Sequence, residues 1–229
     1  MTTAKVARST KGTKAVTGKG GKMAQAAQAA HAELPREVRI IGGTWKRSKL
    51  PVANRPGLRP TPDRVRETVF NWLGQSLAGW RCLDAFAGSG ALGFEAASRG
   101  AAEVVLLERD PALLASLVAS KTRLHAETLR IERADAVQWM ARAAPESFEL
   151  VFLDPPFDSK LLAPALAAAA RVVTPLGLVY VESGMASGTD SWGQGWQVFR
   201  SARAGAVHFG LLRRAALESG AAAESVGRP

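Results

Sequence analysis

From Arg81 onward, short apolar runs alternate with longer segments whose apolar positions recur at helical spacing. The predicted strands are residues 82–86, 104–108, 129–133, 148–153, 178–181, 197–201 and 206–212. The predicted helices are residues 91–99, 111–125 and 161–172. Nearly continuous apolar strands separated by helices indicate a parallel sheet covered on both faces, so the fold class is α/β and Rossmann-like. The closing hairpin, with its turn at residues 202–205, predicts one antiparallel strand at or near the sheet edge.

A smaller unit precedes this pattern. Residues 39–45 read as a strand and a glycine turn, followed by a return strand that ends near Leu50. Thr61 is then expected to cap a helix with Pro62 at its first position. Val65, Val69 and Trp72 recur at helical spacing, and Gly74 ends the segment.

The two ends of the chain lack such patterns. Residues 1–37 are rich in Lys, Gly, Thr and Ala, a composition that buries too little surface to offset the entropy of ordering. We therefore expect a disordered basic tail (1–37), an RNA-facing hairpin and helix (38–79), the main α/β domain (80–214) and a flexible C-terminal tail (215–229). A transit peptide is a weaker interpretation of the basic start, because it contains many glycines and lysines.

Charge is unevenly distributed along the 229 residues. The formal net charge is +10, and the first 66 residues hold 15 basic and 3 acidic side chains, against 15 and 17 in the other 163. Such a basic arm beside a near-neutral domain is typical of proteins that bind a polyanion. For residues 1–22 a solubilising tail explains the charge as well. In residues 39–66 apolar residues lie between the charges, and Arg39, Lys46 and Arg47 are candidates for RNA contact.

The rest of the composition narrows the class of protein. One cysteine, Cys82, excludes an internal disulfide and fits a reducing compartment. The longest apolar runs are too short to span a membrane, and the first thirty residues lack the apolar stretch of a secretory signal. We expect a cytoplasmic protein without a membrane partner.

A glycine loop lies between the first predicted strand of the main domain and its helix. Gly88, Gly90 and Gly93 match the dinucleotide-binding pattern, in which glycine lets the backbone approach a ligand closely. The match is weak by itself, because an ordinary tight turn also explains it. Asp84 would repel a pyrophosphate there and would favour the cationic amino-acid end of S-adenosylmethionine.

Two further acids end the next two strands. Glu108 is placed to hydrogen-bond both ribose hydroxyls, which fits either nucleotide cofactor, although an ordinary solvated strand end is the alternative. Asp135 would lie within reach of an adenine amino group, and capping of a helix at residues 136–142 is the competing role. The candidate cofactor-binding residues are Asp84, Phe86, Gly88, Gly90, Glu108 and Asp135.

The most specific motif is Asp154-Pro155-Pro156-Phe157, directly after the predicted strand 148–153. Its two prolines fix the loop and remove two backbone donors, so acceptors dominate. The Asp154 carboxylate and the Pro155 carbonyl are placed to accept both hydrogens of one amino group, and Phe157 offers a face for a stacked base. A proline-rich strand exit without a chemical role is the alternative.

Such a loop suits methylation of an exocyclic amine on a nucleic-acid base. The ring delocalises the lone pair of this amine, and hydrogen bonds accepted from its N–H groups free that pair for attack. A methyl sulfonium is already a strong electrophile, so in-line positioning supplies much of the remaining rate. No metal is required, and His31, His125 and His208 show no metal-ligand spacing.

Three other functions remain open from the residues alone. An adenine-N6 DNA methyltransferase would use the same loop, but this chain has no room for a sizeable target-recognition domain. The intact Asp154, Pro155 and Phe157 argue against a noncatalytic RNA-binding protein with a retained cofactor pocket. An NAD-dependent reductase is disfavoured by Asp84 and by the lack of a proton donor near the glycine loop.

Five motifs carry a resemblance to a known family. They are Arg39-Ile40-Ile41-Gly42-Gly43, residues 57–68 (GLRPTPDRVRET), residues 70–73 (FNWL), residues 83–93 (LDAFAGSGALG) and Asp154-Pro155-Pro156-Phe157. In order and spacing they resemble the bacterial 16S rRNA (guanine(966)-N(2))-methyltransferase family, the small-subunit rRNA methyltransferase D type. The resemblance covers about residues 38–214, and the basic tail is the main departure from it.

The resemblance implies a seven-stranded class I methyltransferase sheet that uses S-adenosylmethionine. The implied substrate is the N2 amine of a guanine in 16S rRNA, within an assembled or assembling small ribosomal subunit. Guanine rather than adenine, N2 rather than N6, and rRNA rather than DNA rest on the resemblance. It also implies that Asp154 and Phe157 hold the guanine and that residues 59–66, including Arg59, Arg64 and Arg66, meet RNA and cover the cofactor. We expect a monomer.

Overall fold

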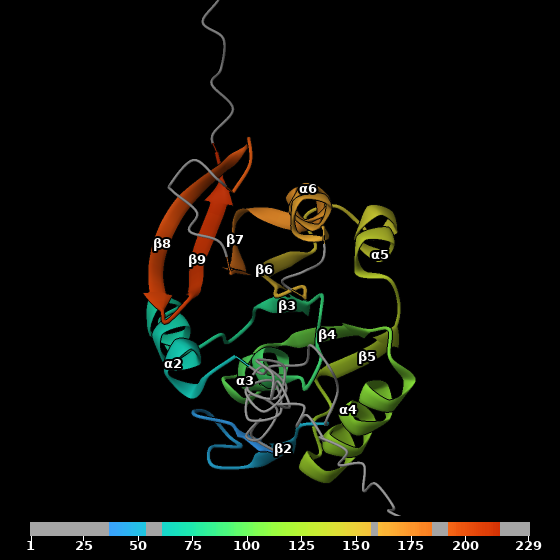
Figure 1. Ribbon diagram of the computed structural model, residues 1–229. Helices are drawn as coiled ribbons and strands as arrows, with labels where there is room; N and C mark the ends of the chain where they lie inside the picture. Colours follow the sequence, from blue (N-terminus) through green and yellow to red (C-terminus); the bar gives the residue numbers. More distant parts are fainter. Residues whose placement is uncertain (1–36, 54–60, 157–159, 185–191, 216–229) are drawn as a thin grey trace, which may run out of the picture. The chain divides into compact units, whose positions relative to one another are not determined.

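The computed structural model describes residues 37–53, 61–156, 160–184 and 192–215, which all belong to one compact unit, Pro35–Pro229 (Figure 1). Residues 1–36 of the predicted disordered tail (1–37) and most of the predicted C-terminal tail lie outside the described residues, whereas Glu37 belongs to the first strand. Within them, no helix is long and apolar enough to cross a membrane.

A seven-stranded sheet forms the centre of this unit, with the strand order β5-β4-β3-β6-β7-β9-β8. The strands are β3 (Arg81–Asp84), β4 (Glu103–Glu108), β5 (Leu129–Arg133), β6 (Phe148–Leu153), β7 (Val173–Ser183), β8 (Trp196–Ala204) and β9 (Val207–Arg214). The first five pair in parallel, whereas β9 runs antiparallel to both β7 and β8. The predicted Rossmann-like fold and the antiparallel strand next to the sheet edge are confirmed.

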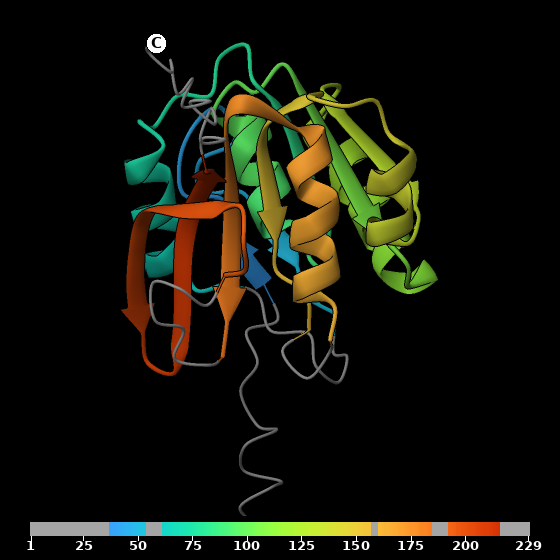
Figure 2. The same ribbon diagram turned by 90° about the horizontal axis from the view of Figure 1, so that it is seen from above.

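Helices cover both faces of the sheet (Figures 1 and 2). One face carries α2 (Asp63–Trp72), α3 (Ala91–Ser98) and α4 (Pro111–Leu124), and the other carries α5 (Ala136–Arg142) and α6 (Leu162–Val172). Successive residues of a strand serve opposite faces, so Cys82 packs in the core beneath α3 and Leu83 in the core beneath α6. The uninterrupted apolar runs of the sequence therefore fill two cores.

The N-terminal hairpin differs from its prediction. β1 (Glu37–Arg39) pairs with β2 (Lys49–Pro51), with Val38 opposite Leu50, so residues 40–48 form a loop rather than a strand and a tight turn. The reason is the contact of this loop with α3, since the Thr44 N–H donates to the Ser98 carbonyl at 2.7 Å. Gly43, at φ +74°, lies so close that a Cβ atom would sit 1.8 Å from that oxygen.

The predicted cap of α2 is also wrong. The helix begins at Asp63, Pro62 is the capping residue, and no side chain makes a capping hydrogen bond to the first turn. Thr61 instead directs its hydroxyl to Asp154, with 3.5 Å between Oγ1 and Oδ2. Strand β7 is longer than predicted, and most other boundaries lie within two residues of the prediction.

A buried ion cluster joins the N-terminal unit to the main domain. The side chains of Arg66 and Glu95 are both fully buried, and Arg66 Nη1 lies 3.3 Å from Glu95 Oε2. Glu95 also accepts hydrogen bonds from the backbone N–H groups of Ile41 and Gly42, at 2.7 and 2.8 Å, and from Arg99 Nε at 2.8 Å. This single carboxylate therefore holds the hairpin loop and α2 against α3.

Arg66 completes the cluster with backbone contacts. Its guanidinium donates to the carbonyl oxygens of Thr61 and Arg39 and forms a 2.7 Å ion pair with Asp63. Burial lowers the pKa of Arg66, and the charges of Glu95 and Asp63 oppose that shift. The expected contact of Arg66 with RNA is wrong for this structure, because the side chain is enclosed and fully engaged.

We expect Arg66→Met to lower the free energy of unfolding by about 3 kcal/mol, because the change leaves part of the Glu95 charge buried without its partner. Arg64 is exposed on the same helix, and the matched variant Arg64→Met should change this free energy by less than about 0.5 kcal/mol. Urea unfolding of both variants checks the contrast. Equal stability of the two variants would refute the structural role of Arg66.

Candidate functional site

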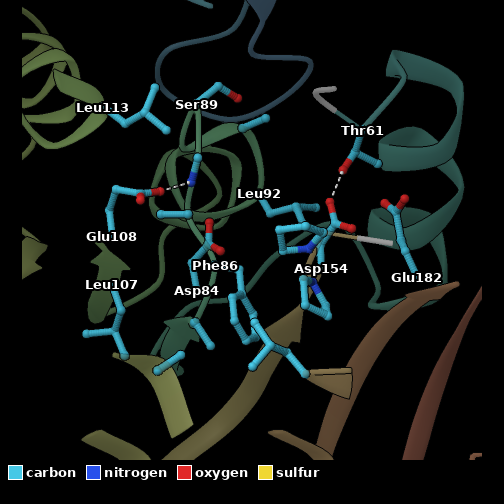
Figure 3. A pocket seen from close by; sticks show the side chains of 18 of the residues that line it. Thr61, Asp84, Phe86, Ser89, Leu92, Leu107, Glu108, Leu113, Asp154 and Glu182 are labelled. Atoms are coloured by element: carbon cyan, nitrogen blue, oxygen red, sulfur yellow. Dashed lines mark hydrogen bonds between the residues drawn. The ribbon is translucent and has the colours of Figure 1, made fainter. Parts of the chain in front are cut away.

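A pocket of about 560 Å³ opens at the carboxyl edge of the sheet (Figure 3). It is lined by the loops that follow β3, β4, β5 and β6, by the end of β7, and by Thr61 and Pro62 from the segment before α2. Its size is typical of sites for small molecules, and this edge is where open parallel sheets bind ligands.

Acids from four neighbouring strands line this pocket. In the order of the sheet, Glu108 ends β4, Asp84 ends β3, Asp154 follows β6, and Glu182 lies near the end of β7. Of the described lining residues only Arg109 is basic, and its exposed side chain pairs with Asp135 at 3.4 Å. The electrostatic field in the pocket therefore favours a ligand that carries positive charge.

The glycine loop turns tightly beneath this row of acids. Gly88 and Gly90 have positive φ angles of 53° and 78°, which glycine adopts without strain. A Cβ atom on Gly90 would lie 2.7 Å from the side chains of Phe94 and Leu117, so packing of the loop on the helices also requires glycine. The sequence correctly placed the loop at the pocket, which Gly88 lines.

Asp84 is buried beneath the loop. Its Oδ2 accepts a hydrogen bond of 2.9 Å from the Gly93 N–H. Loss of hydration raises the pKa of Asp84 to about 7, the Gly93 N–H opposes this shift, and the charge of Glu108 adds to it. A cationic ligand group beside Asp84 would recover part of this cost.

Glu108 is oriented by three backbone donors. Its Oε2 accepts from the Gly88 N–H at 2.9 Å, and its Oε1 accepts from the N–H groups of Arg109 and Asp110 at 2.6 and 2.8 Å. The carboxylate is thereby held at the pocket wall. It ties the glycine loop to the loop after β4.

Asp135 and Phe86 also line the pocket. Asp135 caps α5, because its Oδ1 accepts from the Gln138 N–H at 3.1 Å. The capping role that competed with adenine binding in the sequence is therefore present, and a contact with adenine stays a prediction. Phe86 packs partly against the core beneath α6.

The loop after β6 brings Asp154 and both prolines to the pocket. Burial raises the pKa of Asp154 well above its usual value, and the charges of Glu182 and Asp84 raise it further. The Thr61 hydroxyl donates to this carboxyl group and opposes the shift. Phe157 of the same motif lies outside the described residues.

No site role for Glu182 was predicted from the sequence, and Thr61 was included only within residues 59–66, which the family resemblance implies meet RNA and cover the cofactor. Thr61 reaches the pocket from a different part of the chain, and no local pattern signals that contact. Glu182 did carry a signal, because it follows the apolar run 178–181 as Asp154 follows the run 148–153. An acid at the end of a predicted parallel strand would have identified it.

The candidate RNA-binding residues divide into two places. Arg64 is exposed on the first turn of α2, close in sequence to Thr61 and Pro62 of the pocket wall. Lys46 and Arg47 are exposed on the hairpin loop that contacts Ser98, at the far end of α3 from the glycine loop. Arg39 is also exposed, with a distant pairing to Asp63 at 3.9 Å. Arg59 lies outside the described residues.

No group of three or more His, Cys, Asp or Glu side chains suited to a metal ion occurs in the described part of the chain. The acids of the pocket follow the strand ends in a row. Backbone N–H groups and the hydroxyls of Thr61 and Tyr180 donate to these acids.

Comparisons with known proteins agree with this geometry. Residues 38–213 match the family model described as conserved hypothetical protein 95. The ribosomal RNA small subunit methyltransferase D of Escherichia coli (strain K12) is 42% identical over 183 residues, 79% of this chain and 91% of that protein. The protein of the same name from Haemophilus influenzae is 43% identical over 157 residues, 64% of this chain and 79% of that protein.

Solved structures show the same fold. The Escherichia coli protein yhhF superposes with a TM-score of 0.70 at 38% identity and covers 79% of this chain and 99% of its own. The precorrin-6y C5,15-methyltransferase of Geobacter metallireducens, at 16% identity and a TM-score of 0.55, covers 72% of this chain and 93% of its own. The likeness to yhhF supports a Rossmann-like methyltransferase fold, and the second likeness shows the same fold alone.

The raised pKa of Asp84 predicts a stability effect. Between the usual carboxyl pKa of 3.8 and about 7, the folded protein holds a proton that the unfolded chain has released. The free energy of unfolding therefore falls as pH rises through this range. We expect Asp84→Asn, which still accepts from Gly93, to raise this free energy by about 2 kcal/mol at pH 8 and little at pH 4. Urea unfolding at both pH values checks it, and an identical pH dependence in parent and variant would contradict it.

Proposed function

The chain belongs to the ribosomal RNA small subunit methyltransferase D family, and on this basis we propose that it transfers the methyl group of S-adenosylmethionine to the N2 amine of one guanine in 16S rRNA. The observation that carries the proposal is the row of acids at the sheet edge, with Asp154 and its prolines beside a pocket in which exposed Arg109 is the one basic residue among the described lining residues. The part of the pocket around Asp84 suits a cationic cofactor, and the part around Asp154 suits an amine that donates hydrogen bonds.

The residues present fit S-adenosylmethionine. Asp84 would face the ammonium of its methionine part, Glu108 the ribose hydroxyls, and Asp135 the adenine edge, with Phe86, Gly88 and Gly90 shaping the wall between them. When bound, the cofactor supplies an electrophilic methyl group on a positively charged sulfur. The negative field of the pocket favours that charge, and Asp84 recovers part of the free energy lost to its burial.

Asp154 and Pro155 act on the amine of the base. The Asp154 carboxylate and the Pro155 carbonyl accept its two N–H groups, which draws the nitrogen towards tetrahedral geometry and frees its lone pair. Thr61 fixes the orientation of Asp154. After transfer the nitrogen carries a positive charge and loses a proton. Asp154 is a suitable acceptor, because its pKa stands well above its usual value. Phe157 would stack on the base.

The substrate is 16S rRNA in an assembled or assembling small ribosomal subunit. A paired or stacked guanine cannot bring its amine to a pocket at the sheet edge, so the target base is presented unstacked or turned out of its helix. Exposed Arg64 beside the pocket wall, and Lys46 and Arg47 on the hairpin loop that contacts Ser98, would contact phosphates. The enzyme acts as a monomer in the cytoplasm.

Methyl transfer to small subunits from a strain that lacks this gene tests the proposal. With labelled S-adenosylmethionine, we expect one methylguanine per subunit, identified by nuclease digestion and mass spectrometry. Subunits from the parent strain should accept no label. Asp154→Ala should lower kcat by about 100-fold or more, while calorimetry shows adenosylhomocysteine affinity within about threefold of the parent. An active Asp154→Ala enzyme would remove the mechanism, and label on another base or on N6 of adenine would remove the function.

Charge reversal of Arg64 tests the RNA-facing side. We expect Arg64→Glu to weaken binding to small subunits and to reduce the slope of log K against log salt by about 1, because one phosphate contact is lost. The control is Arg142→Glu, an exposed arginine on α5 at the opposite face of the sheet. Filter binding over a salt series measures both slopes. The same slope in Arg64→Glu and Arg142→Glu would show that α2 does not face RNA.

A further inference from the structure

Glu182 is the acid of the pocket that the methyl-transfer chemistry leaves without a role. Its side chain is buried, with 4% of the residue exposed, and it lines the pocket at the end of β7. The Tyr180 hydroxyl donates to Glu182 Oε1 at 2.6 Å and orients the carboxylate. Figure 3 shows Glu182 next to Asp154.

The sheet register explains this proximity. Leu153 of β6 is paired with Val181 of β7, so the next residues, Asp154 and Glu182, emerge side by side from adjacent parallel strands. Adjacent strands lie about 4.8 Å apart, a spacing from which two carboxylates can converge on neighbouring atoms of one ring. The charge of Glu182 also acts directly on Asp154.

This arrangement is costly for folding. Glu182 is buried beside the half-buried Asp154, and the charge of Glu182 raises the pKa of Asp154. A glutamine would accept the Tyr180 hydroxyl equally well without the negative charge. A carboxylate kept beside a second acid, where an amide would serve the structure equally well, is typical of positions kept for function.

The arrangement of hydrogen-bond donors on the amino bases indicates a function for the Glu182 carboxylate. In guanine the exocyclic amine stands beside N1–H, so two adjacent donors lie on one edge. In adenine and cytosine the atom beside the amine is an acceptor, which a carboxylate repels. A second fixed acceptor next to the one that binds the amine therefore matches guanine and opposes the other two amino bases.

We propose that Glu182 accepts the guanine N1–H and thereby selects guanine as the base whose amine Asp154 binds. This inference rests on the proposed function and adds the residue that determines base choice. Asp154 then acts on the reacting amine, whereas Glu182 reads the neighbouring ring nitrogen. The Tyr180 hydroxyl is the positioning group for that acceptor.

A base analogue tests it directly. 2-Aminopurine carries the same 2-amine as guanine, but its N1 is an acceptor. Small subunits are reconstituted with 16S rRNA in which the methylated guanine, located by mass spectrometry, is replaced by 2-aminopurine. We expect the parent enzyme at pH 8 to prefer guanine over 2-aminopurine by about 30-fold or more in kcat/KM.

Glu182→Gln should reduce this preference to within about threefold, because the amide can donate to N1 of 2-aminopurine or accept from N1–H of guanine. The control Glu127→Gln, at an exposed turn, should keep the parent ratio. The affinity for adenosylhomocysteine is measured for each protein, and an unchanged value shows that the cofactor-binding part of the pocket is intact.

The outcomes separate the two proposals. Equal use of both bases by the parent, or an unchanged ratio in Glu182→Gln, overturns the role of Glu182 while guanine methylation stands. A Glu182→Gln enzyme that loses rate equally on both bases shows a structural role and also overturns it. Absence of transfer to guanine by the parent overturns the proposed function, and this inference with it.

Discussion

Carboxylates gathered at one edge of the sheet repel one another and oppose folding, and among the described residues around them only exposed Arg109 is basic. Glu108, Asp84, Asp154 and Glu182 come from four adjacent strands and share a single pocket. Backbone N–H groups and the hydroxyls of Thr61 and Tyr180 stabilise them in part, but the pKa values of Asp84 and Asp154 remain raised. The rest of the fold supplies the stability that this edge removes.

A buried carboxylate that is paired with cations occurs where the N-terminal hairpin and α2 contact α3. There Glu95 is also fully buried, but Arg66, Arg99 and two backbone donors surround it. Every charge in that cluster has a partner of the opposite sign. The contrast distinguishes a structural acid from the acids of the pocket: Glu95 is enclosed by its partners, whereas the acids of the pocket line a space that a ligand can enter.

Local patterns predicted most of the sheet and the part of the pocket that it carries. Strands 129–133 and 148–153 were predicted with their observed bounds, and the loops after them brought Asp135 and Asp154 to the expected edge. Such features follow from runs of apolar residues and from the rule that ligands bind at the carboxyl ends of parallel strands.

Features that depend on contacts between residues distant in sequence could not be predicted from local patterns. Arg66 looked like a surface cation, because its partners Glu95 and the Arg39 carbonyl are distant in sequence. Residues 40–45 looked like strand and turn, yet their N–H groups bond to α3. The contact of Thr61 with Asp154 spans 93 positions and leaves no trace in any local pattern.

The contact between Thr61 and Asp154 limits how segments of this protein can be exchanged with those of other proteins. Thr61 precedes the helix that carries Arg64, and Arg66 of the same helix holds the Thr61 carbonyl at 3.3 Å. The segment before α2 therefore lines part of the pocket through Thr61, while Arg64 of α2 is exposed to solvent. A chimera that kept residues 80–214 and received a foreign targeting module would lose this hydroxyl, and the orientation of Asp154 with it. Retargeting by domain exchange must transplant the Thr61–Arg66 segment intact.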